Sequence, residues 1–524
     1  MRTPSHGHCE LGLAGLLALL GVTVLSACGG GQPPPIQVAD SPDALATLSI
    51  GDAVLVGDGR SPFETSCGKL SDGYTFKRHT ETDPRLAVDP TDPGKLVIAF
   101  MRDPILAIST ARSVDGGSSW QEVEPPAHSP CTGSDYNAYG DQDIDADAAG
   151  RFYLVSSQGD FTPEGVPMDP TKDAWMDSAL VASVSDDGGA SWSPPVVLAP
   201  TGEYQHTALV VADKQRAGYA TAIWGVGKNP SVLEHMQPHL EDNKVYAAHT
   251  RDGGKTWSAP EPVMPGFGAL DLAQFSDGEL LAVGPGTGDK MAWAMLNYAL
   301  GQLKTSRAAS AGAWSDMLEL PLSSNTGAFM HPEGEMVLAI DVPIALGSDD
   351  TLYRVASIYH RSKICSLLDM VLGRPLGWCG DPANESGSVQ LTRSLDRGVT
   401  WEAPNIVSVL RGPAWNAAVG TTPSGAIGVF WYDSRDDVTG DGAISVQARF
   451  AVSIDQGKHW TEVALSDPFD LTQGPTPHVM LYLGNYFEVK AMGDSSFAVA
   501  YAVGPPLAVA GQSDIHFRRI DVVE

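Results

Sequence analysis

A short segment rich in Asp and Gly has the residue types and the spacing of a calcium-binding loop. Positions 1, 3 and 5 of the pattern hold Asp437, Thr439 and Asp441, and oxygen atoms of this kind are the ligands that Ca²⁺ prefers. Gly442 occupies the turn position, but Ala448 stands at position 12, where such a loop needs a bidentate Glu. The segment therefore predicts a partial Ca²⁺ site completed by water, with a metal-free Asp/Gly hairpin loop as the alternative. We expect no required cofactor.

A second run of aspartates has similar chemistry but a different pattern. It consists of Asp141, Asp143, Asp145 and Asp147. Counted from Asp143, position 12 is Leu154, and alternate residues of an extended strand lie on one side. We interpret this run as a strand and its turn.

The N-terminus indicates export. Residues 11–27 form an apolar run that is too short and wrongly flanked for a stable membrane span and is typical of a signal peptide. The tripeptide Leu-Ser-Ala before Cys28 resembles the bacterial lipobox, whose cysteine becomes the lipidated first residue of the mature protein. We therefore expect residues 1–27 to be a signal peptide and residues 28–46 to be the lipidated cysteine and a flexible tether. This places the protein in the bacterial cell envelope, anchored by lipid to the outer membrane or cell surface. A plain cleaved secretory peptide is the alternative.

Cleavage and lipidation leave four cysteines in the mature chain. An even number of cysteines in an exported protein favours two disulfides. The separation of 14 residues favours a bond between Cys365 and Cys379, and a bond between Cys67 and Cys131 follows by elimination.

Composition narrows the class of protein. The net charge is −30, so attraction to nucleic acid phosphates or to anionic lipid is not expected. Hydrophobic residues make up 43% of the chain and charged residues 18%, which is enough apolar material for a folded core. We expect a monomer that binds no nucleic acid and meets a membrane only through its lipid anchor.

One pattern, Ser/Thr-x-Asp-x-Gly-x-x-Trp, occurs five times. Its aspartates are Asp115, Asp187, Asp252, Asp396 and Asp455. Asp accepts hydrogen bonds from turn amides, Gly supplies a positive φ, and the Trp anchors the turn, so each copy predicts the tip of a β-hairpin. The pattern resembles the Asp-box or bacterial neuraminidase repeat family, and this resemblance implies an all-β fold, a β-propeller with four-stranded antiparallel blades.

The spacing of the repeats gives the number of blades. Successive aspartates are 72, 65, 144 and 59 residues apart, so one copy has decayed, and Trp314 lies where it is missing. Strand-like runs at 483–491, 496–503 and 514–523 follow the last copy, and residues 47–57 could supply their fourth strand. The sequence thus predicts one propeller domain over residues 47–524, closed by an N-terminal strand. Seven blades are favoured, and six is the alternative if the Trp314 unit is an insertion.

The resemblance also implies site residues. Sialidases with this repeat bind the substrate carboxylate with three arginines and use a Tyr nucleophile, a Glu that assists it and an Asp acid/base. By resemblance Tyr486 would be the nucleophile, Glu385 its base and Asp103 the acid/base. A buried structural tyrosine is the alternative for Tyr486, and Glu488 is its nearest carboxylate in the sequence, on the same side of one strand.

The arginines match the family only in part. The substrate-binding candidates are Arg85, Arg102, Arg354 and Arg435. The family's first arginine precedes a proline that this chain keeps as Pro84, but the arginine itself is absent. Arg85 could substitute for it, and a solvated or cross-strand arginine is the favoured alternative. The sequence therefore predicts an exported sialidase-like propeller, an exo-glycoside hydrolase acting on sialic acid or related glycans. The alternative is a non-catalytic surface propeller that binds glycan or protein.

Overall fold

The computed structural model describes most of the chain after residue 44. The described residues are 45–68, 76–162, 174–199, 204–227, 244–265, 271–285, 303–308, 314, 318–319, 327–331, 336–339, 344–360, 386–438, 440–476 and 481–523. They contain short 3-10 turns at Pro130–Thr132 and Leu471–Gln473, and no α-helix occurs among them. No helix in this part of the chain is long and apolar enough to cross a membrane. The apolar run 11–27 and Cys28 lie outside the described residues.

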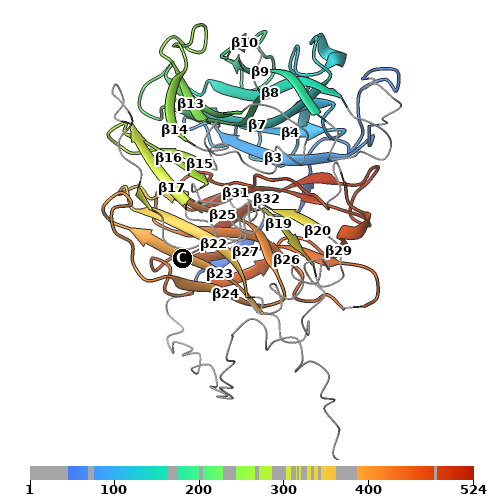
Figure 1. Ribbon diagram of the computed structural model, residues 1–524. Helices are drawn as coiled ribbons and strands as arrows, with labels where there is room; N and C mark the ends of the chain where they lie inside the picture. Colours follow the sequence, from blue (N-terminus) through green and yellow to red (C-terminus); the bar gives the residue numbers. More distant parts are fainter. Residues whose placement is uncertain are drawn as a thin grey trace, which may run out of the picture. The chain divides into compact units, whose positions relative to one another are not determined.

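Seven sheets in the described part of the chain have four or more strands, and they follow one another along the sequence (Figure 1). The first sheet is β3 (Glu81–Val88), β4 (Leu96–Arg102), β5 (Ala107–Ser113) and β6 (Gln121–Val123). The second is β7 (Ala138–Ala146), β8 (Phe152–Thr162), β9 (Ala174–Ser185) and β10 (Val196–Val197). The third is β11 (Tyr204–Ala212), β12 (Ala220–Gly227), β13 (Lys244–Thr250) and β14 (Glu261–Pro265). The fourth is β15 (Asp271–Gln274), β16 (Leu280–Pro285), β17 (Leu303–Ala308) and β18 (Leu318–Glu319).

The remaining sheets have the same order of strands. The fifth is β21 (Ile344–Leu346), β22 (Leu352–His360), β23 (Ser386–Ser394) and β24 (Asn405–Arg411). The sixth is β25 (Ala414–Thr421), β26 (Ile427–Asp433), β27 (Ser445–Ser453) and β28 (Thr461–Ala464), with β29 (Phe469–Asp470) beside β27. The seventh is β30 (Val489–Ala491), β31 (Ser496–Val503) and β32 (Asp514–Val523). A two-stranded sheet, β19 (Gly327–Met330) and β20 (Met336–Ala339), lies between the fourth and fifth sheets in sequence.

The N-terminal strand completes the seventh sheet, as the sequence predicts. β1 (Thr47–Ile50) pairs with β32 in antiparallel register, Thr47 opposite Val523 and Ile50 opposite Ile520. β2 (Val54–Leu55) then pairs with the earlier part of β32. The last sheet is therefore built from both ends of the described chain.

The first strands of the sheets contact one another in a cycle. β3 contacts β7, β7 contacts β11, β11 contacts β15 and β15 contacts β21. β21 contacts β25, β25 contacts β30, and β30 contacts β3 again. Four-stranded antiparallel sheets whose first strands meet in this order form a β-propeller. The count of seven blades stays a prediction, because residues between 285 and 344 are described only in short pieces.

Each of the five repeats forms the turn between the third and fourth strands of its sheet. In the first copy, Ser113 Oγ donates to Asp115 Oδ1 over 2.8 Å and accepts from the backbone N–H of Gly117 at 2.9 Å. Asp115 Oδ1 also accepts from the backbone N–H of Ser119 at 2.9 Å. The other copies make the same bonds. We call the end of the sheets that carries these turns the repeat end.

The repeat tryptophans link neighbouring sheets. Trp192 donates from Nε1 to Thr110 of the first sheet over 3.1 Å. Trp120 of the first sheet meets Phe517 of the seventh with ring centroids 5.1 Å apart. Trp314 lies between β17 and β18, where the decayed copy is expected, and donates to Glu261 over 3.2 Å.

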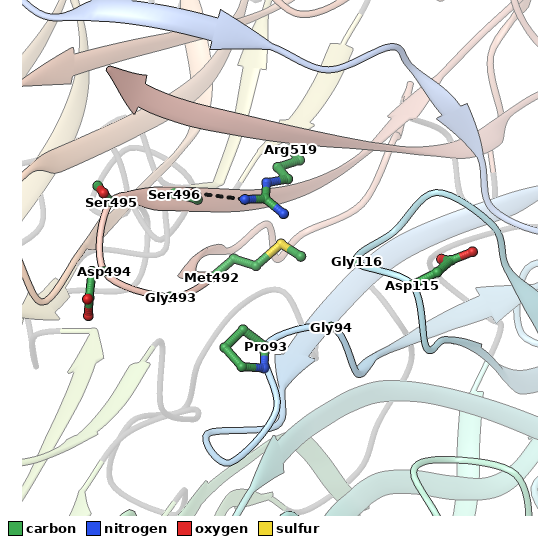
Figure 2. A pocket seen from close by; sticks show the side chains of 10 residues that line it. All are labelled: Pro93, Gly94, Asp115, Gly116, Met492, Gly493, Asp494, Ser495, Ser496 and Arg519. Atoms are coloured by element: carbon green, nitrogen blue, oxygen red, sulfur yellow. Dashed lines mark hydrogen bonds between the residues drawn. The ribbon is translucent and has the colours of Figure 1, made fainter. Parts of the chain in front are cut away.

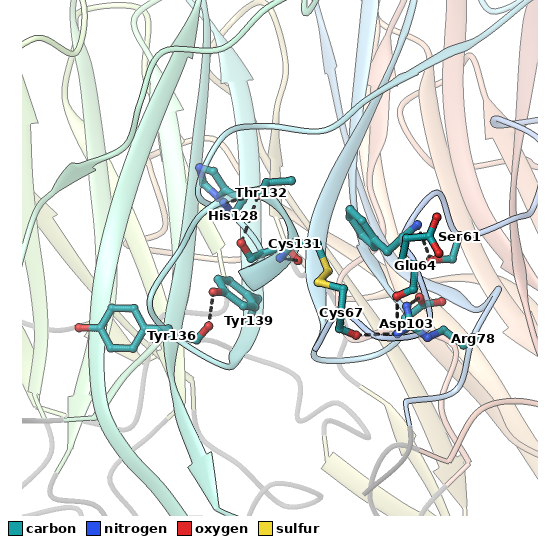
Figure 3. The surroundings of a disulfide bond; sticks show 12 residues. Ser61, Glu64, Cys67, Arg78, Asp103, His128, Cys131, Thr132, Tyr136 and Tyr139 are labelled. Carbon is teal, nitrogen blue, oxygen red and sulfur yellow. Dashed lines mark hydrogen bonds and ion pairs between the residues drawn. A yellow bond between two sulfur atoms is a disulfide. The ribbon is translucent and has the colours of Figure 1, made fainter. Parts of the chain in front are cut away.

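A disulfide joins Cys67 to Cys131, so the segment before the first sheet is tied to the loop that leads into the second (Figure 3). Arg78, in the same segment, donates to Asp103 Oδ2 over 3.0 Å and to the carbonyl of Cys67 over 2.8 Å. Cys365 and Cys379 lie outside the described residues, so their bond stays a prediction.

Candidate functional site

Four first strands carry the same backbone irregularity. Asp83, Asp141, Thr207 and Asn416 have positive φ angles of 55°, 48°, 55° and 54°. In each strand the register with its neighbour shifts at this residue, which marks a β-bulge. The bulges lie near the starts of the first strands, whereas the repeats follow the ends of the third strands, so the two features lie at opposite ends of the sheets. We call the end with the bulges the bulged end. Bulges and positive φ at non-glycine residues concentrate at functional sites, which makes the bulged end the first place to look for one.

Hydrogen bonds join the bulged residues to a neighbouring bulge or to the segment before β30. Asp83 accepts from the hydroxyl of Tyr482 and from the backbone N–H of Asn485. Asp141 Oδ2 accepts from the backbone N–H of Thr207 at 2.9 Å. Asn416 donates from Nδ2 to the carbonyl of Gly484 over 2.9 Å. Side chains at the bulges therefore hold the first strands together.

A cluster of charged side chains lies next to the bulges. We call it the Arg85 cluster, and it consists of Arg85, Asp143, Tyr486 and Glu488. Arg85 Nη1 lies 3.3 Å from Glu488 Oε1, and Arg85 Nε lies 3.4 Å from Asp143 Oδ1. The guanidinium carbon lies 4.7 Å from the centroid of the Tyr486 ring, a cation–π contact. Arg85 is 1% exposed, and its Nη2 has no hydrogen-bond partner among the described residues. Tyr486 and Glu488 thus meet the same arginine, although both precede β30 and do not lie within one strand as the sequence predicts.

The carboxylates of this region also bind backbone groups of the next sheet. Glu488 Oε2 accepts from the N–H of Leu86 at 3.0 Å, and Asp143 Oδ2 accepts from the N–H of Val210 at 2.7 Å. The first strand of every sheet is an edge strand whose outward N–H groups need acceptors when they are buried. Asp143 on β7 and Glu488 just before β30 supply those acceptors, so part of this charge has a structural task.

Burial changes the acidity of these groups. Burial raises the pKa of Asp143 to about 7, opposed by the charge of Arg85 and assisted by that of Glu488. Burial likewise raises the pKa of Asp83 to about 6, although its hydrogen bond from Tyr482 acts in the opposite direction. A carboxyl group with a pKa near neutral can donate a proton at neutral pH, as a general acid must.

The environment of Tyr486 works against its ionisation. Burial, followed by the charge of Asp141, raises the pKa of the Tyr486 hydroxyl well above its usual value, while Arg85 acts in the opposite direction. The residue is 4% exposed. It precedes β30, whose first residue is Val489. A tyrosine nucleophile needs a lowered pKa or an adjacent base, so this position favours a structural role as much as a catalytic one.

The other predicted arginines lie in separate surroundings. Arg102 Nη2 pairs with Glu81 at 3.0 Å and with Glu122 at 2.8 Å. Arg435 pairs with Asp433 at 2.6 Å and Glu462 at 2.7 Å, both in its own sheet.

The remaining predicted catalytic and binding residues are also distributed. Arg354 is buried in β22. Asp103 directly follows β4, the second strand of the first sheet, and pairs with Arg78 at 3.0 Å. Glu385 lies outside the described residues. The structure therefore brings together Arg85 and Tyr486 from the predicted set, and the roles of all these residues stay predictions.

The segment with the calcium-loop spacing makes hairpin hydrogen bonds. Asp437 Oδ1 accepts from the N–H of Ser445 at 2.7 Å, and Asp441 Oδ1 accepts from the N–H of Ala443 at 2.9 Å. Thr439 lies outside the described residues. Within the described residues, no group of three or more His, Cys, Asp or Glu side chains is placed to hold a metal ion. The partial Ca²⁺ site stays a prediction.

Sequence reasoning missed most of the acidic residues at the bulged end. Asp143 was visible as one of four alternating aspartates in a strand, which the structure confirms as β7. The positive φ at Asp83 and Asp141 had no such signal. Asp and Asn tolerate this conformation, but their presence in a strand does not require it.

A surface hollow of about 420 Å³ lies at the repeat end (Figure 2). No residue of the Arg85 cluster lines it. Asp115 and Gly116 of the first sheet line one side of it, and Met492, Ser496 and Arg519 of the seventh line the other. Arg519 is engaged with Asp521 at 2.7 Å and with Ser496 at 3.3 Å. The Arg85 cluster and this hollow are therefore separate features.

No family model and no curated protein matches the sequence. Solved structures with a related arrangement include a protein of unknown function from Dyadobacter fermentans, which is 11% identical with a TM-score of 0.44 and covers 91% of this chain and 99% of its own. A GH93 α-L-arabinofuranosidase of Fusarium graminearum is 10% identical with a TM-score of 0.40, covering 89% and 97%. A Hadza microbial sialidase is 12% identical with a TM-score of 0.39, covering 86% and 69%. Similarity at this level leaves the activity of this chain open.

Proposed function

We propose that this protein is a carbohydrate-active propeller that hydrolyses glycosidic bonds at its bulged end, acting from the chain end on sialic acid or a related acidic sugar. One observation carries the proposal. Arg85 is buried beside Tyr486 with Nη2 unpaired among the described residues. A buried guanidinium N–H without an acceptor is costly, and the carboxylate of an acidic sugar would supply one.

The neighbouring carboxyl groups supply acid–base chemistry for such a substrate. Asp143, with a pKa raised to about 7 by burial, would protonate the leaving oxygen. Glycoside hydrolases commonly use two carboxyl groups. Glu488, beside the same guanidinium, would be the second. Tyr486 would form the wall against which Arg85 is held.

The test is turnover of a fluorogenic α-sialoside and of related acidic glycosides by the full chain. Arg85→Lys keeps the charge but loses the planar fork, so we expect it to raise KM, while Asp143→Asn should lower kcat. Arg519→Lys is the control, because Arg519 is paired with Asp521 at the repeat end. Equal effects of Arg85→Lys and Arg519→Lys would remove Arg85 from substrate binding.

The second candidate is a surface propeller that binds glycan or protein without cleaving it. The burial of Tyr486 and the engagement of both Glu488 oxygens favour this function. Glycan binding without product, abolished by Arg85→Ala and unchanged by Asp143→Asn, would identify it.

For either function we also propose export and a lipid anchor at Cys28. Uptake of a fatty acid label by wild type and not by Cys28→Ser would test this anchor.

A further inference from the structure

The chain enters the propeller at the repeat end. β1 begins at Thr47, opposite Val523 at the end of β32, and β32 is the third strand of its sheet, the strand that in other sheets leads into a repeat. The carbonyl of Ala46 accepts from Thr461 Oγ1 at 2.9 Å, one residue after the tryptophan of the fifth repeat. Figure 2 places Arg519 of β32 across the hollow from Asp115 of the first repeat. The point of entry thus lies between the repeat turns of the sixth and first sheets.

Exposed apolar side chains gather around this point. Three repeats have an apolar residue between the hydroxyl residue and the Asp, namely Val114 (61% exposed), Leu395 (67%) and Ile454 (44%). These repeats belong to the first, fifth and sixth sheets. In the second and third sheets the same position holds Asp186 and Arg251, both exposed and charged.

Other exposed apolar residues extend the same surface. Leu45 is 53% exposed and Val523 is 46% exposed, both where β1 meets β32, and Val399 is 60% exposed in the repeat of the fifth sheet. Single exposed apolar residues are ordinary on soluble proteins. Here four of them occupy repeat turns of the first, fifth and sixth sheets, and two lie where β1 meets β32 in the seventh, which is the arrangement that needs a cause. We call Leu45, Val114, Leu395, Val399, Ile454 and Val523 the apolar tips.

The repeat aspartates beside the apolar tips are exposed, but hydrogen bonds hold each of them within its own turn. Asp115 binds Ser113 and Ser119, and Asp396 binds Ser394 and Thr400. The net charge of −30 disfavours an anionic surface. The surface that suits the apolar tips therefore has an apolar interior beneath neutral, hydrated headgroups.

The predicted lipid on Cys28 and the length of chain between it and Leu45 indicate which surface this is. Cys28 precedes Leu45 by 17 residues, and a chain of that length spans at most about 60 Å when fully extended. A lipid on Cys28 would hold the repeat end within this reach of the bilayer, which raises its effective concentration at the membrane.

We propose that the apolar tips rest on the lipid surface to which Cys28 tethers the chain, so that the bulged end faces away from the membrane. This proposal rests on the lipid anchor and is independent of glycoside hydrolysis. It goes beyond the expectation that the lipid alone meets the membrane. It also gives the bulged end free access to large substrates outside the envelope surface.

The experiment uses full-length protein, processed in a bacterium that makes lipoproteins and reconstituted into phosphatidylcholine vesicles with brominated acyl chains. An environment-sensitive fluorophore is attached in turn at Leu395→Cys and at Val438→Cys, and wild type carried through the same labelling sets the background. Val438 is the matched control, because it is an exposed valine, 67% exposed, in the connection between β26 and β27 at the bulged end. We expect bromine to quench the label at position 395 and to leave the label at position 438 unchanged.

A second variant tests whether the tips act together. With the label at Val114→Cys, replacing Leu395 and Ile454 by Ser should reduce the quenching, since the remaining tips would no longer hold this end on the lipid. If the protein floats with the vesicles but position 395 is unquenched, the docking is wrong and the anchor stands. If the protein does not float, the anchor and the docking both fail. Equal quenching at positions 395 and 438 would overturn the orientation.

Discussion

The two ends of the sheets are held by hydrogen bonds of different range. At the repeat end, Asp115 bonds to residues two and four positions away. At the bulged end, Asp83 bonds to Tyr482 across 399 residues, and Glu488 bonds to Leu86 across 402. A short pattern in the sequence can encode the first kind of bond completely. The second kind exists only after the last sheet has closed against the first.

The ends also differ in how they treat carboxylates. Hydrogen bonds from Thr256 and Thr400 lower the pKa of Asp252 and Asp396 to about 2 at the repeat end. Burial raises the pKa of Asp83 to about 6 and that of Asp143 to about 7 at the bulged end. Exposed, fully hydrogen-bonded carboxylates stabilise turns, whereas buried ones keep protons available, which is the property that chemistry needs.

The largest expected difference between the two ends comes from removing a cation. Arg85→Met leaves Asp143 buried without the guanidinium and leaves Glu488 paired with Lys490, and we expect a loss of about 3–5 kcal/mol in the free energy of unfolding. Arg519→Met at the repeat end removes an exposed pair with Asp521 and should cost less than about 1 kcal/mol. Urea denaturation followed by tryptophan fluorescence measures both. Similar losses for the two variants would contradict the difference in burial.

A smaller effect is expected from one methyl group. A Cβ on Gly484 would lie 2.8 Å from the backbone nitrogen of Asp83, where the seventh sheet meets the first. Gly425 is the control, because it also has a positive φ, 91°, but a Cβ there meets nothing within 4 Å. We expect Gly484→Ala to lose about 1–3 kcal/mol more than Gly425→Ala, since overpacking adds to the shared backbone strain. Equal losses in urea denaturation would show that the closure between the two sheets is loose.

The same contrast explains what the sequence could predict. The repeat turns, the strand order and the closing strand at Thr47–Ile50 follow from local residue types and spacing, and the structure has them. The Arg85 cluster does not follow from local residue types, because Asp143 and Glu488 are 345 positions apart and no local pattern predicts that both contact one guanidinium. Resemblance chose Arg85 and Tyr486, which do meet, together with Arg102 and Arg435, which pair within other networks.

The smallest effect is a change in how stability depends on pH, and it has opposite sign at the two ends. The folded pKa of Asp83, about 6, lies above its usual 3.8, so the folded state keeps a proton that the unfolded chain releases. Its contribution to stability is complete below the unfolded pKa and declines as pH rises through about 6. The folded pKa of Asp396, about 2, lies below 3.8, so its contribution is complete above the unfolded pKa and declines as pH falls through about 2. Asp83→Asn, which also suits the positive φ, should flatten the decline in Tm above pH 4, and Asp396→Asn should flatten it below pH 4, about the pKa of a free aspartate. Thermal unfolding followed by circular dichroism across this range measures both slopes, and identical pH profiles for the two variants would mean that the ends do not differ in the way their carboxylates are held.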